Sequence, residues 1–340
     1  MSEDHYPEYI AALLKAEKYP HPVDTVDLVQ THISFVLLAG DFVYKFKKPV
    51  NFGFLDFSTL EKRGYCCEQE LVLNRRLSPE IYLGLVTVTD DDGVITLDGQ
   101  GPVIEYGVKM RRMPEERMMV RVIDRGELQP DHIQALVDVL VPFYEKAETS
   151  PAIDKFGTAE AVAVNVLENF DQTRDFIGGG ALSREQFDLI SAYARSVLAQ
   201  TDIFQARIEA GRIRDCHGDL YSANICLADK VYIYDCIEFN ERFRYCDVAS
   251  DVAFLAMDLD FHGLQEMSAL FIDRFCARSG DEGLRQMLNF YTCYRAYVRG
   301  KIGLFTAADP AVDAQVKERC LAAAARYFSL ACQYAEQGEG

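Results

Sequence analysis

A short stretch of this sequence concentrates residues that can do acid–base and metal chemistry. It contains His217, Asp219 and Asn224, and Asp235 follows two short apolar runs. Only residues 228–230 can turn between those runs, so we expect a hairpin that returns Asp235 to the neighbourhood of Asn224. Mg²⁺ prefers hard oxygen ligands, and ATP-dependent phosphoryl transfer needs an acidic side chain to orient or deprotonate the attacking hydroxyl. We predict Asp219 as that base, with Asn224 and Asp235 as magnesium ligands.

The order His-x-Asp-x4-Asn, followed by Asp235, resembles the catalytic loop of the aminoglycoside phosphotransferase and choline kinase-like enzymes, which are relatives of the protein kinases. The resemblance implies that Asp219 is the catalytic base and that Asn224 and Asp235 bind magnesium. It also implies that His217 is structural and braces the loop. The alternative is that His-Gly-Asp is only a polar turn, because this tripeptide is common by chance.

A second part of the resemblance lies downstream, in residues 247–253. This run is similar to the start of a helix in the same enzymes, where the second Asp ties down the catalytic loop. Asp251 is therefore expected to support the site, and Asp247 is expected chiefly as a residue of the helix N-terminus.

Upstream, a kinase of this kind needs a strand lysine for the ATP phosphates and a helix glutamate to hold that lysine. Strand alternation puts Val43, Lys45 and Lys47 on one face. Lys45 is preferred over Lys47, because Val43 then forms the apolar roof over adenine. For the glutamate, Glu70 fits the Glu-x3-Leu-x2-Leu pattern of the family better than Glu68, although either could be a solvated carboxylate.

Two further residues are predicted to contact the nucleotide. No Gly-x-Gly-x-x-Gly precedes the lysine strand, and the run 30–34 stands there instead. Ser34 and backbone amides of that run are predicted to contact phosphate, with a plain surface turn as the alternative. The strand through 103–113 should run into the interlobe hinge, which places Met110 near adenine by resemblance.

These residues need an α+β scaffold, and we predict a two-lobed protein-kinase-like fold with an N-terminal lobe at 1–113 and a C-terminal lobe at 114–340. The first lobe should hold an antiparallel sheet and one long helix, and the second should be mainly helical. The periodicity predicts the following segments: helices at 8–18, 58–77, 131–144, 158–176 and 183–210; two strands within 26–50 around Gly40; and strands at 83–88, 94–97 and 103–110. Capping boxes are expected at Ser58–Glu61 and Ser183–Gln186.

Composition and charge limit the classes of partner that the protein is expected to bind. The 340 residues carry a formal charge of −18, which repels nucleic acid, so no nucleic-acid partner is expected. No apolar run reaches the length of a membrane span and the N-terminus lacks a leader pattern, so we expect a cytoplasmic protein without a membrane partner. The ten cysteines are a small fraction of so long a chain, so they are expected to be reduced, mostly buried thiols, and no zinc-type spacing occurs among them.

The favoured function is therefore an ATP- and Mg²⁺-dependent small-molecule kinase with a hydroxylated acceptor. A nucleotide-binding regulatory module without turnover is the alternative, and a protein kinase is disfavoured because no Ala-Pro-Glu follows Asp235. The chain most resembles a bacterial branch that is sometimes fused to a P-loop domain, which is expected to be absent here. Glu238, Asp258 and Asp260 could hold a cationic amine, but a structural or solvated role is favoured. The oligomeric state, the acceptor and the choice between ATP and GTP stay open.

Overall fold

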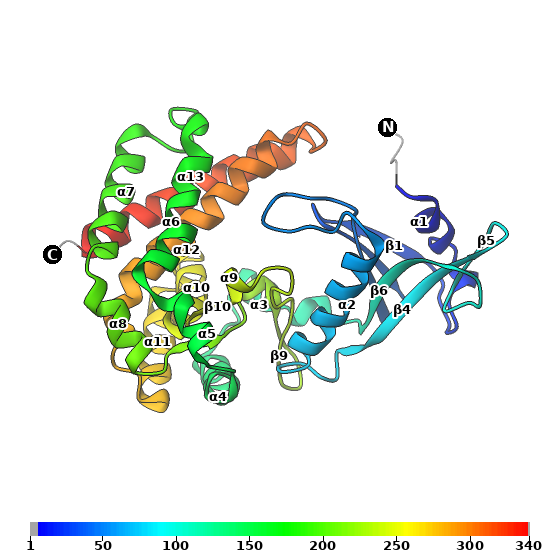
Figure 1. Ribbon diagram of the computed structural model, residues 1–340, viewed down its shortest axis with the longest axis horizontal. Coiled ribbons are helices and arrows are strands. Elements are labelled where there is room, and N and C mark those ends of the chain that lie inside the picture. The colour runs from blue at the N-terminus through cyan, green and yellow to red at the C-terminus, as the bar shows by residue number, and fades with distance from the viewer. Residues whose placement is uncertain (1–5, 339–340) are drawn as a thin grey trace. The chain divides into compact units, whose positions relative to one another are not determined.

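The computed structural model describes residues 6–338 and divides the chain into two compact units (Figure 1). The first unit runs to Met118 and also contains Tyr232–Glu241, and the second contains Met119–Val231 and the chain from Arg242 onward. The predicted lobes, 1–113 and 114–340, differ from this division chiefly because Tyr232–Glu241 belongs to the first unit. A sheet-bearing unit followed by a helical one is the predicted α+β, kinase-like class of fold.

The first unit is built on an antiparallel six-stranded sheet with the order β1-β2-β3-β6-β4-β5. Its elements are α1 (Glu8–Leu13), η1 (Ala16–Lys18), β1 (Val26–Gln30), β2 (Ser34–Ala39), β3 (Phe42–Lys47), α2 (Leu60–Asn74), β4 (Tyr82–Asp91), β5 (Val94–Leu97), β6 (Val103–Arg111) and η2 (Glu115–Arg117). The predicted helix over 8–18 is wrong in length, since α1 ends at Leu13. The prediction of two strands within 26–50 is also wrong, because the chain turns at 31–33 and forms three.

Strand alternation gives the sheet two different faces. Tyr44 and Phe46 of β3 are buried in a hydrophobic core that also takes Ile10 and Leu13 of α1. The opposite face carries Lys45 and Lys47, and α2 packs there against β4 and β6 (Figure 1). Gly40 joins β2 to β3 with φ +58°, a left-handed conformation that suits glycine in a tight turn.

Helix α2 begins one residue later than predicted. Its N-cap is Thr59, whose hydroxyl accepts a hydrogen bond from the Lys62 N–H at 3.3 Å. The predicted cap, Ser58, instead donates its hydroxyl to Asp56 at 2.5 Å. The helix ends at Asn74 rather than at residue 77, so it is shorter than expected.

The second unit is mainly helical. Its elements are α3 (Met119–Asp124), α4 (Pro130–Lys146), α5 (Pro151–Asp154), η3 (Lys155–Gly157), α6 (Ala159–Thr173), η4 (Arg174–Phe176), α7 (Arg184–Leu198), α8 (Thr201–Glu209), β7 (Ile213–Asp215), η5 (Ser222–Asn224), β8 (Ile225–Leu227), β10 (Tyr245–Asp247), α10 (Val248–Phe261), α11 (Gln265–Ser279), α12 (Leu284–Ala308) and α13 (Ala314–Gly338). Two short elements span the unit boundaries, β9 (Val231–Ile233) and α9 (Glu241–Arg244). Strands β7 and β10 pair antiparallel.

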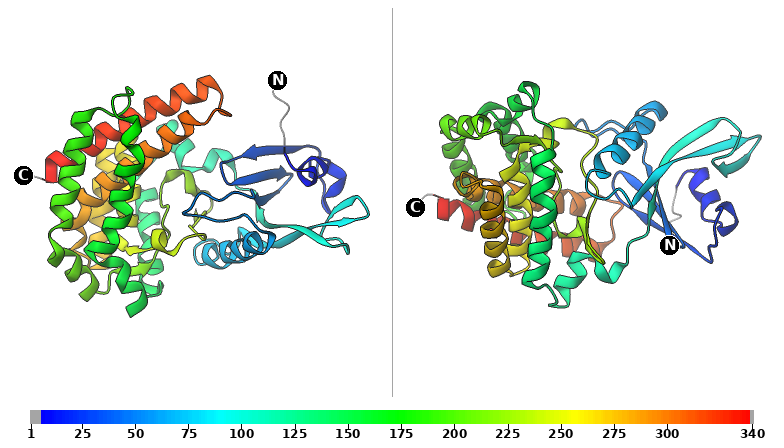
Figure 2. Two further views of the ribbon diagram at one scale, coloured as in Figure 1. Left: turned by 45° about the horizontal axis from the view of Figure 1, so that its top comes forward. Right: turned by 90° about the horizontal axis from the view of Figure 1, so that it is seen from below.

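Helix α10 is the central element of this unit, because all its residues from Val248 to Leu259 are buried. It packs against α11 and α12, and α12 lies along α13, the long orange and red pair in Figure 2. A helix that is apolar all round must be enclosed on every side, so its few acidic residues need partners within the protein.

Most predicted helices of the second unit are present, with one correction. The predicted helix over 183–210 is two helices, because the chain breaks between α7 and α8 at Ala199 and Gln200. The capping box at Ser183 and Gln186 is confirmed, with both reciprocal hydrogen bonds formed. The two predicted strands around 228–230 are confirmed as β8 and β9, and the Ala228 N–H donates to the Lys230 carbonyl at 3.1 Å across the turn.

The cysteines are as expected: all ten are free thiols, and seven of them are buried. Within residues 6–338, no helix is both long enough and apolar enough to cross a bilayer.

Candidate active site

Strand β3 presents two lysines on the face covered by α2. Lys45 lies opposite Val36 of β2 and Val108 of β6, while Lys47 lies opposite Ser34. Directly opposed residues in an antiparallel sheet point to the same side, so these side chains share one face. The sheet thereby places two ammonium groups on the face covered by α2, where buried carboxylates must balance their positive charge.

Lys45 lies between two carboxylates of the first unit. Its Nζ is 2.9 Å from Glu70 Oε1 and 2.5 Å from Asp235 Oδ1. Burial alone would lower the pKa of Lys45, but Asp235 and Glu70 outweigh burial and raise it well above its usual value. Lys45 is therefore a permanently charged group at the point where α2 meets the segment after β9.

Glu70 is the glutamate that α2 directs at the lysines. It is fully buried, whereas Glu68 is exposed on the outer side of the helix. Burial would raise the pKa of Glu70, yet Lys45 and Lys47 together lower it to about 2. The structure thus brings together Lys45 and Glu70, the pair that the sequence favoured.

Asp235 stands in an unusual backbone conformation. Its φ is +62°, in the left-handed region that non-glycine residues seldom adopt. Side chains of the same unit hold the surrounding backbone: the Asp235 N–H donates to the Tyr82 hydroxyl at 3.1 Å, the Cys236 N–H donates to Asn74 Oδ1 at 2.9 Å, and Ser78 exchanges two hydrogen bonds with Ile233. The Asp235 carboxylate remains 45% exposed on this fixed backbone.

In the second unit, the loop that contains Asp219 is held by one buried carboxylate. Asp251 of α10 accepts hydrogen bonds from the His217 N–H at 2.6 Å and the Gly218 N–H at 2.9 Å, and from the Tyr144 hydroxyl at 3.2 Å. Gly218 has φ +87°, so a glycine suits this position. These are the contacts expected of a residue that ties down the loop.

The same loop orients Asp219 and Asn224 toward each other. His217 is fully buried, and its Nδ1 accepts from the Asp219 N–H at 3.2 Å. Asn224 Nδ2 donates to the Asp219 carbonyl at 2.9 Å and to Asp219 Oδ2 at 3.0 Å. Asp235 belongs to the other unit, so its convergence with Asn224 stays a prediction.

Comparison with known proteins gives a fold but no function. No protein-family model matches the chain. Uncharacterized proteins of Mycobacterium tuberculosis and Mycobacterium bovis are 33% identical over 321 residues, covering 92% of this chain and 61% of theirs. The chain therefore spans less than two thirds of the length of these relatives.

Two solved structures resemble the whole chain. One is a spectinomycin phosphotransferase in complex with ADP and spectinomycin, with a TM-score of 0.50, 11% identity and 99% coverage of both chains. The other is an amicoumacin kinase in complex with AMP-PNP and Ca²⁺, with a TM-score of 0.52, 12% identity, and coverage of 95% of this chain and 94% of that one. The chain has the kinase-like fold of these phosphotransferases. The predicted resemblance is thus confirmed at the level of fold.

Within this kinase-like fold, the two other predicted nucleotide contacts lie on the lysine face of the sheet. Met110 of β6 pairs with Val43, and Ser34 pairs with Lys47. Ser34 is buried at the start of β2, whereas the preceding residues 31–33 form a mostly exposed turn. Contact of either residue with a nucleotide stays a prediction.

Three acidic residues considered for a cationic acceptor have structural contacts. Glu238 contacts Lys47, Asp258 accepts from the Ser222 N–H at 2.9 Å, and Asp260 accepts from the Tyr334 hydroxyl at 2.5 Å. Burial raises the pKa of Glu238, and Lys47 opposes that rise. The structural role that the sequence favoured for them accords with these contacts.

Sequence reasoning missed Arg295 as part of the loop support. This buried residue of α12 donates to the Gly218 carbonyl at 3.1 Å and to Ser250 Oγ at 3.0 Å. Its guanidinium is also 3.8 Å from Asp251 Oδ1. Nothing in the local sequence around Arg295 signals this contact, since its partners lie 45 and 77 residues away.

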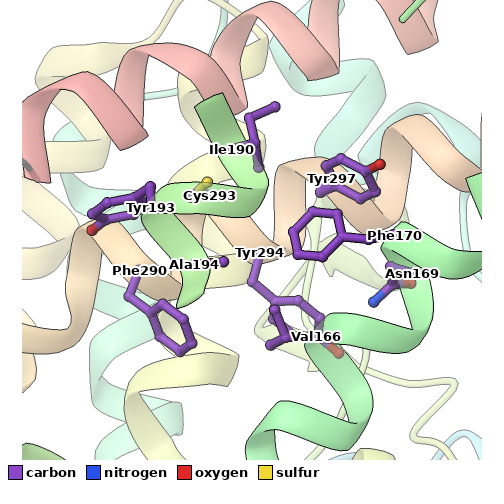
Figure 3. Close-up of a pocket in the computed structure, with 10 residues that line it drawn as sticks. All are labelled: Val166, Asn169, Phe170, Ile190, Tyr193, Ala194, Phe290, Cys293, Tyr294 and Tyr297. Carbon is purple, nitrogen blue, oxygen red and sulfur yellow. The ribbon is translucent and has the colours of Figure 1, made fainter. Parts of the chain in front are cut away.

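A small enclosed cavity in the second unit lies away from these residues. Figure 3 shows it among side chains of α6, α7 and α12, most of them aromatic or aliphatic: Val166, Asn169, Phe170, Ile190, Tyr193, Ala194, Phe290, Cys293, Tyr294 and Tyr297. Its lining contains neither Asp219 nor Asn224, so we assign it to the helical core.

Proposed function

We propose that this protein is an ATP- and Mg²⁺-dependent phosphotransferase that acts on a hydroxyl group of a small molecule. The observation that carries the proposal is the position of the Lys45 ammonium between buried Glu70 and the half-exposed carboxylate of Asp235. This is the arrangement that a kinase uses to hold phosphates and metal side by side. Two proteins with the same fold are named a phosphotransferase and a kinase, and their structures hold ADP or AMP-PNP.

The donor set of the chain fits magnesium and a nucleotide. Asp235 supplies an accessible carboxylate, and Asn224 turns its amide nitrogen toward Asp219, which leaves its oxygen on the other side of the amide. Hard oxygens of this kind suit Mg²⁺. When bound, the ion would neutralise charge on the phosphates. In this proposal Lys45 pairs with phosphate oxygens, and Val43 and Met110 lie beside the base.

Asp219 is the proposed general base. The acceptor oxygen forms a new bond to the γ-phosphorus of ATP while the bond to the β–γ bridging oxygen breaks, and ADP leaves with that oxygen. The proton of the attacking hydroxyl passes to the Asp219 carboxylate. One hydrogen bond from Asn224 holds that carboxylate, and the bond from the Asp219 N–H to His217 holds the backbone beside it, before any substrate arrives.

The acceptor is proposed only as a hydroxylated small molecule. Glu238, Asp258 and Asp260 each contact groups of the protein, so we do not assign them to a cationic amine. The acceptor class must therefore come from experiment.

The direct test is transfer of the terminal phosphate of labelled ATP to a panel of sugars, amino alcohols and hydroxylated antibiotics in the presence of Mg²⁺. Wild type should label at least one acceptor, and Asp219→Asn should label none while remaining folded. Binding of Mg·ATP without labelling of any acceptor or water would favour the regulatory module instead. Equal labelling by wild type and Asp219→Asn would remove Asp219 from the role of base.

A further inference from the structure

The second lysine of β3 has a role that the proposed mechanism does not use. Lys47 is 1% exposed, whereas Lys45 is 15% exposed. The Lys47 ammonium is 2.8 Å from Glu70 Oε2, also contacts Glu238, and lies 4.9 Å from the centre of the Phe57 ring. A charge this deeply buried is stable only when carboxylates surround it.

The five charged side chains form one continuous chain of alternating sign. Asp235 contacts Lys45, Lys45 and Lys47 each contact one oxygen of Glu70, and Lys47 contacts Glu238. Asp235 and Glu238 come from one short segment, the lysines come from β3, and Glu70 comes from α2. The chain of charges therefore joins three separate elements of the first unit.

The two ends of this chain differ in exposure. At the outer end, Lys45 and Asp235 are 15% and 45% exposed. At the inner end, Lys47 and Glu238 are 1% and 5% exposed. Incoming phosphate and metal can replace the outer pair, since water already reaches it, whereas exchange of the inner pair would leave unpaired charge in the protein interior.

We propose that Glu238 is a positioning residue, whose buried ion pair with Lys47 holds the segment of Asp235 in place when Asp235 leaves Lys45 to bind the metal. This inference rests on the proposed function, because it assigns Asp235 to the metal. The inner pair adds to the hydrogen bonds that the backbone of this segment forms with Tyr82, Asn74 and Ser78, and that backbone includes a left-handed aspartate.

Glu238→Gln removes the charge and keeps the shape of the side chain. The matched control is Glu105→Gln, because Glu105 is also buried and pairs with buried Arg63 of α2 at 2.9 Å. Hydrogen exchange of the nucleotide-free protein is the first measurement. The Asp235 and Cys236 amides should exchange at least about tenfold faster in Glu238→Gln and within about twofold of wild type in Glu105→Gln.

The second measurement is the affinity for a nonhydrolysable ATP analogue with and without Mg²⁺. Glu238→Gln should weaken Mg²⁺-dependent binding about tenfold and change metal-free binding by less than about twofold. If Glu238→Gln does not fold, the double variant Lys47→Met/Glu238→Leu takes its place, because it removes both charges of the inner pair. We expect the same faster amide exchange and the same weaker Mg²⁺-dependent binding in that variant.

Unchanged exchange and unchanged metal dependence in a folded variant would overturn the proposal. Equal shifts in Glu105→Gln would also overturn it, because the effect would then be general destabilisation. A wild type that binds no Mg·nucleotide would instead contradict the proposed function. In that case the exchange rates alone decide whether Glu238 anchors the segment.

Discussion

The candidate site residues of the two units form two sets, and each set is held by a different kind of interaction. In the second unit, Asp251 holds the loop of Asp219 by accepting hydrogen bonds from the backbone N–H groups of His217 and Gly218. In the first unit, Lys45, Glu70 and Asp235 hold one another through ion pairs between side chains. Hydrogen bonds to the backbone fix the geometry of a loop, whereas ion pairs between side chains can be replaced by contacts with a ligand.

This difference indicates which of the two sets of residues is organised before any ligand binds. The base needs a fixed position relative to a hydroxyl, so a rigid loop suits it. The phosphate and metal side must accept a highly charged ligand, and charges that already balance each other avoid the cost of isolated buried charge. Each of the following variants changes residues of one set and leaves the other set intact.

The largest effect is expected from Asp219→Ala. Loss of a general base should reduce transfer about 10²- to 10⁴-fold, while affinity for Mg·ATP should change by less than about threefold. Single-turnover transfer and calorimetric binding would measure the two quantities. A loss of nucleotide affinity as large as the loss of transfer would mean that Asp219 also takes part in nucleotide binding.

Asp251→Ala should act on stability as well as on transfer. It leaves the His217 and Gly218 N–H groups and the Tyr144 hydroxyl without their acceptor, which should cost about 3–5 kcal/mol of unfolding free energy. Asp258→Ala is the control, since it removes the acceptor of the Ser222 N–H and should cost about 1–3 kcal/mol. Denaturant unfolding compares them, and equal losses would contradict the special grip of Asp251.

The contributions of Glu70 and Glu105 to folding stability should depend on pH with opposite signs. The pKa of Glu70 is lowered to about 2, so its contribution to stability is present above about pH 4.5 and is lost as the pH falls toward 2. The advantage of wild type over Glu70→Gln should shrink by on the order of 3 kcal/mol across that range.

Burial raises the pKa of Glu105, so ionisation of this carboxyl disfavours the folded state. The advantage of wild type over Glu105→Gln should therefore grow as the pH falls through the raised pKa. Urea unfolding between about pH 6 and pH 2 measures both series. Parallel slopes would show that the lysines do not depress the pKa of Glu70.

The smallest effect concerns the backbone of Asp235. Because its φ is +62°, Asp235→Gly should be about 1 kcal/mol more stable than Asp235→Ala, although both lose the carboxylate. Asp92, with φ +50° in the exposed turn between β4 and β5, is the matched control. The same Gly-over-Ala gain is expected there, with no change in nucleotide affinity. A more stable alanine at position 235 would mean that the left-handed conformation is not maintained.

The sequence predicted those parts of the site that depend on local spacing. Alternation placed Lys45 and Lys47 on one face, the helix from Thr59 carried Glu70, and the run at 247–253 placed Asp251 where a helix begins. It could not choose firmly between Glu70 and Glu68, since burial depends on what packs against α2. The contacts in the structure make that choice.

The parts that the sequence did not predict depend on distant partners. A structural or solvated role was favoured for Glu238, but its partner was not predicted, because Lys47 lies 191 residues away. Arg295 reaches Gly218 over 77 residues. The break between α7 and α8 was missed because Ala199 and Gln200 are neither glycine nor proline. The cap at Thr59 was misplaced because two adjacent hydroxyl residues fit the same pattern, and Asp56 engages the first of them.

Calorimetric titration of wild type and Asp235→Ala with a nonhydrolysable ATP analogue, with and without Mg²⁺, tests whether Asp235 holds the metal. We expect Mg²⁺-dependent binding in wild type and loss of that dependence in Asp235→Ala, with residual metal-free binding in both. Absence of binding in wild type, or the same Mg²⁺ dependence in Asp235→Ala, would contradict that role of Asp235.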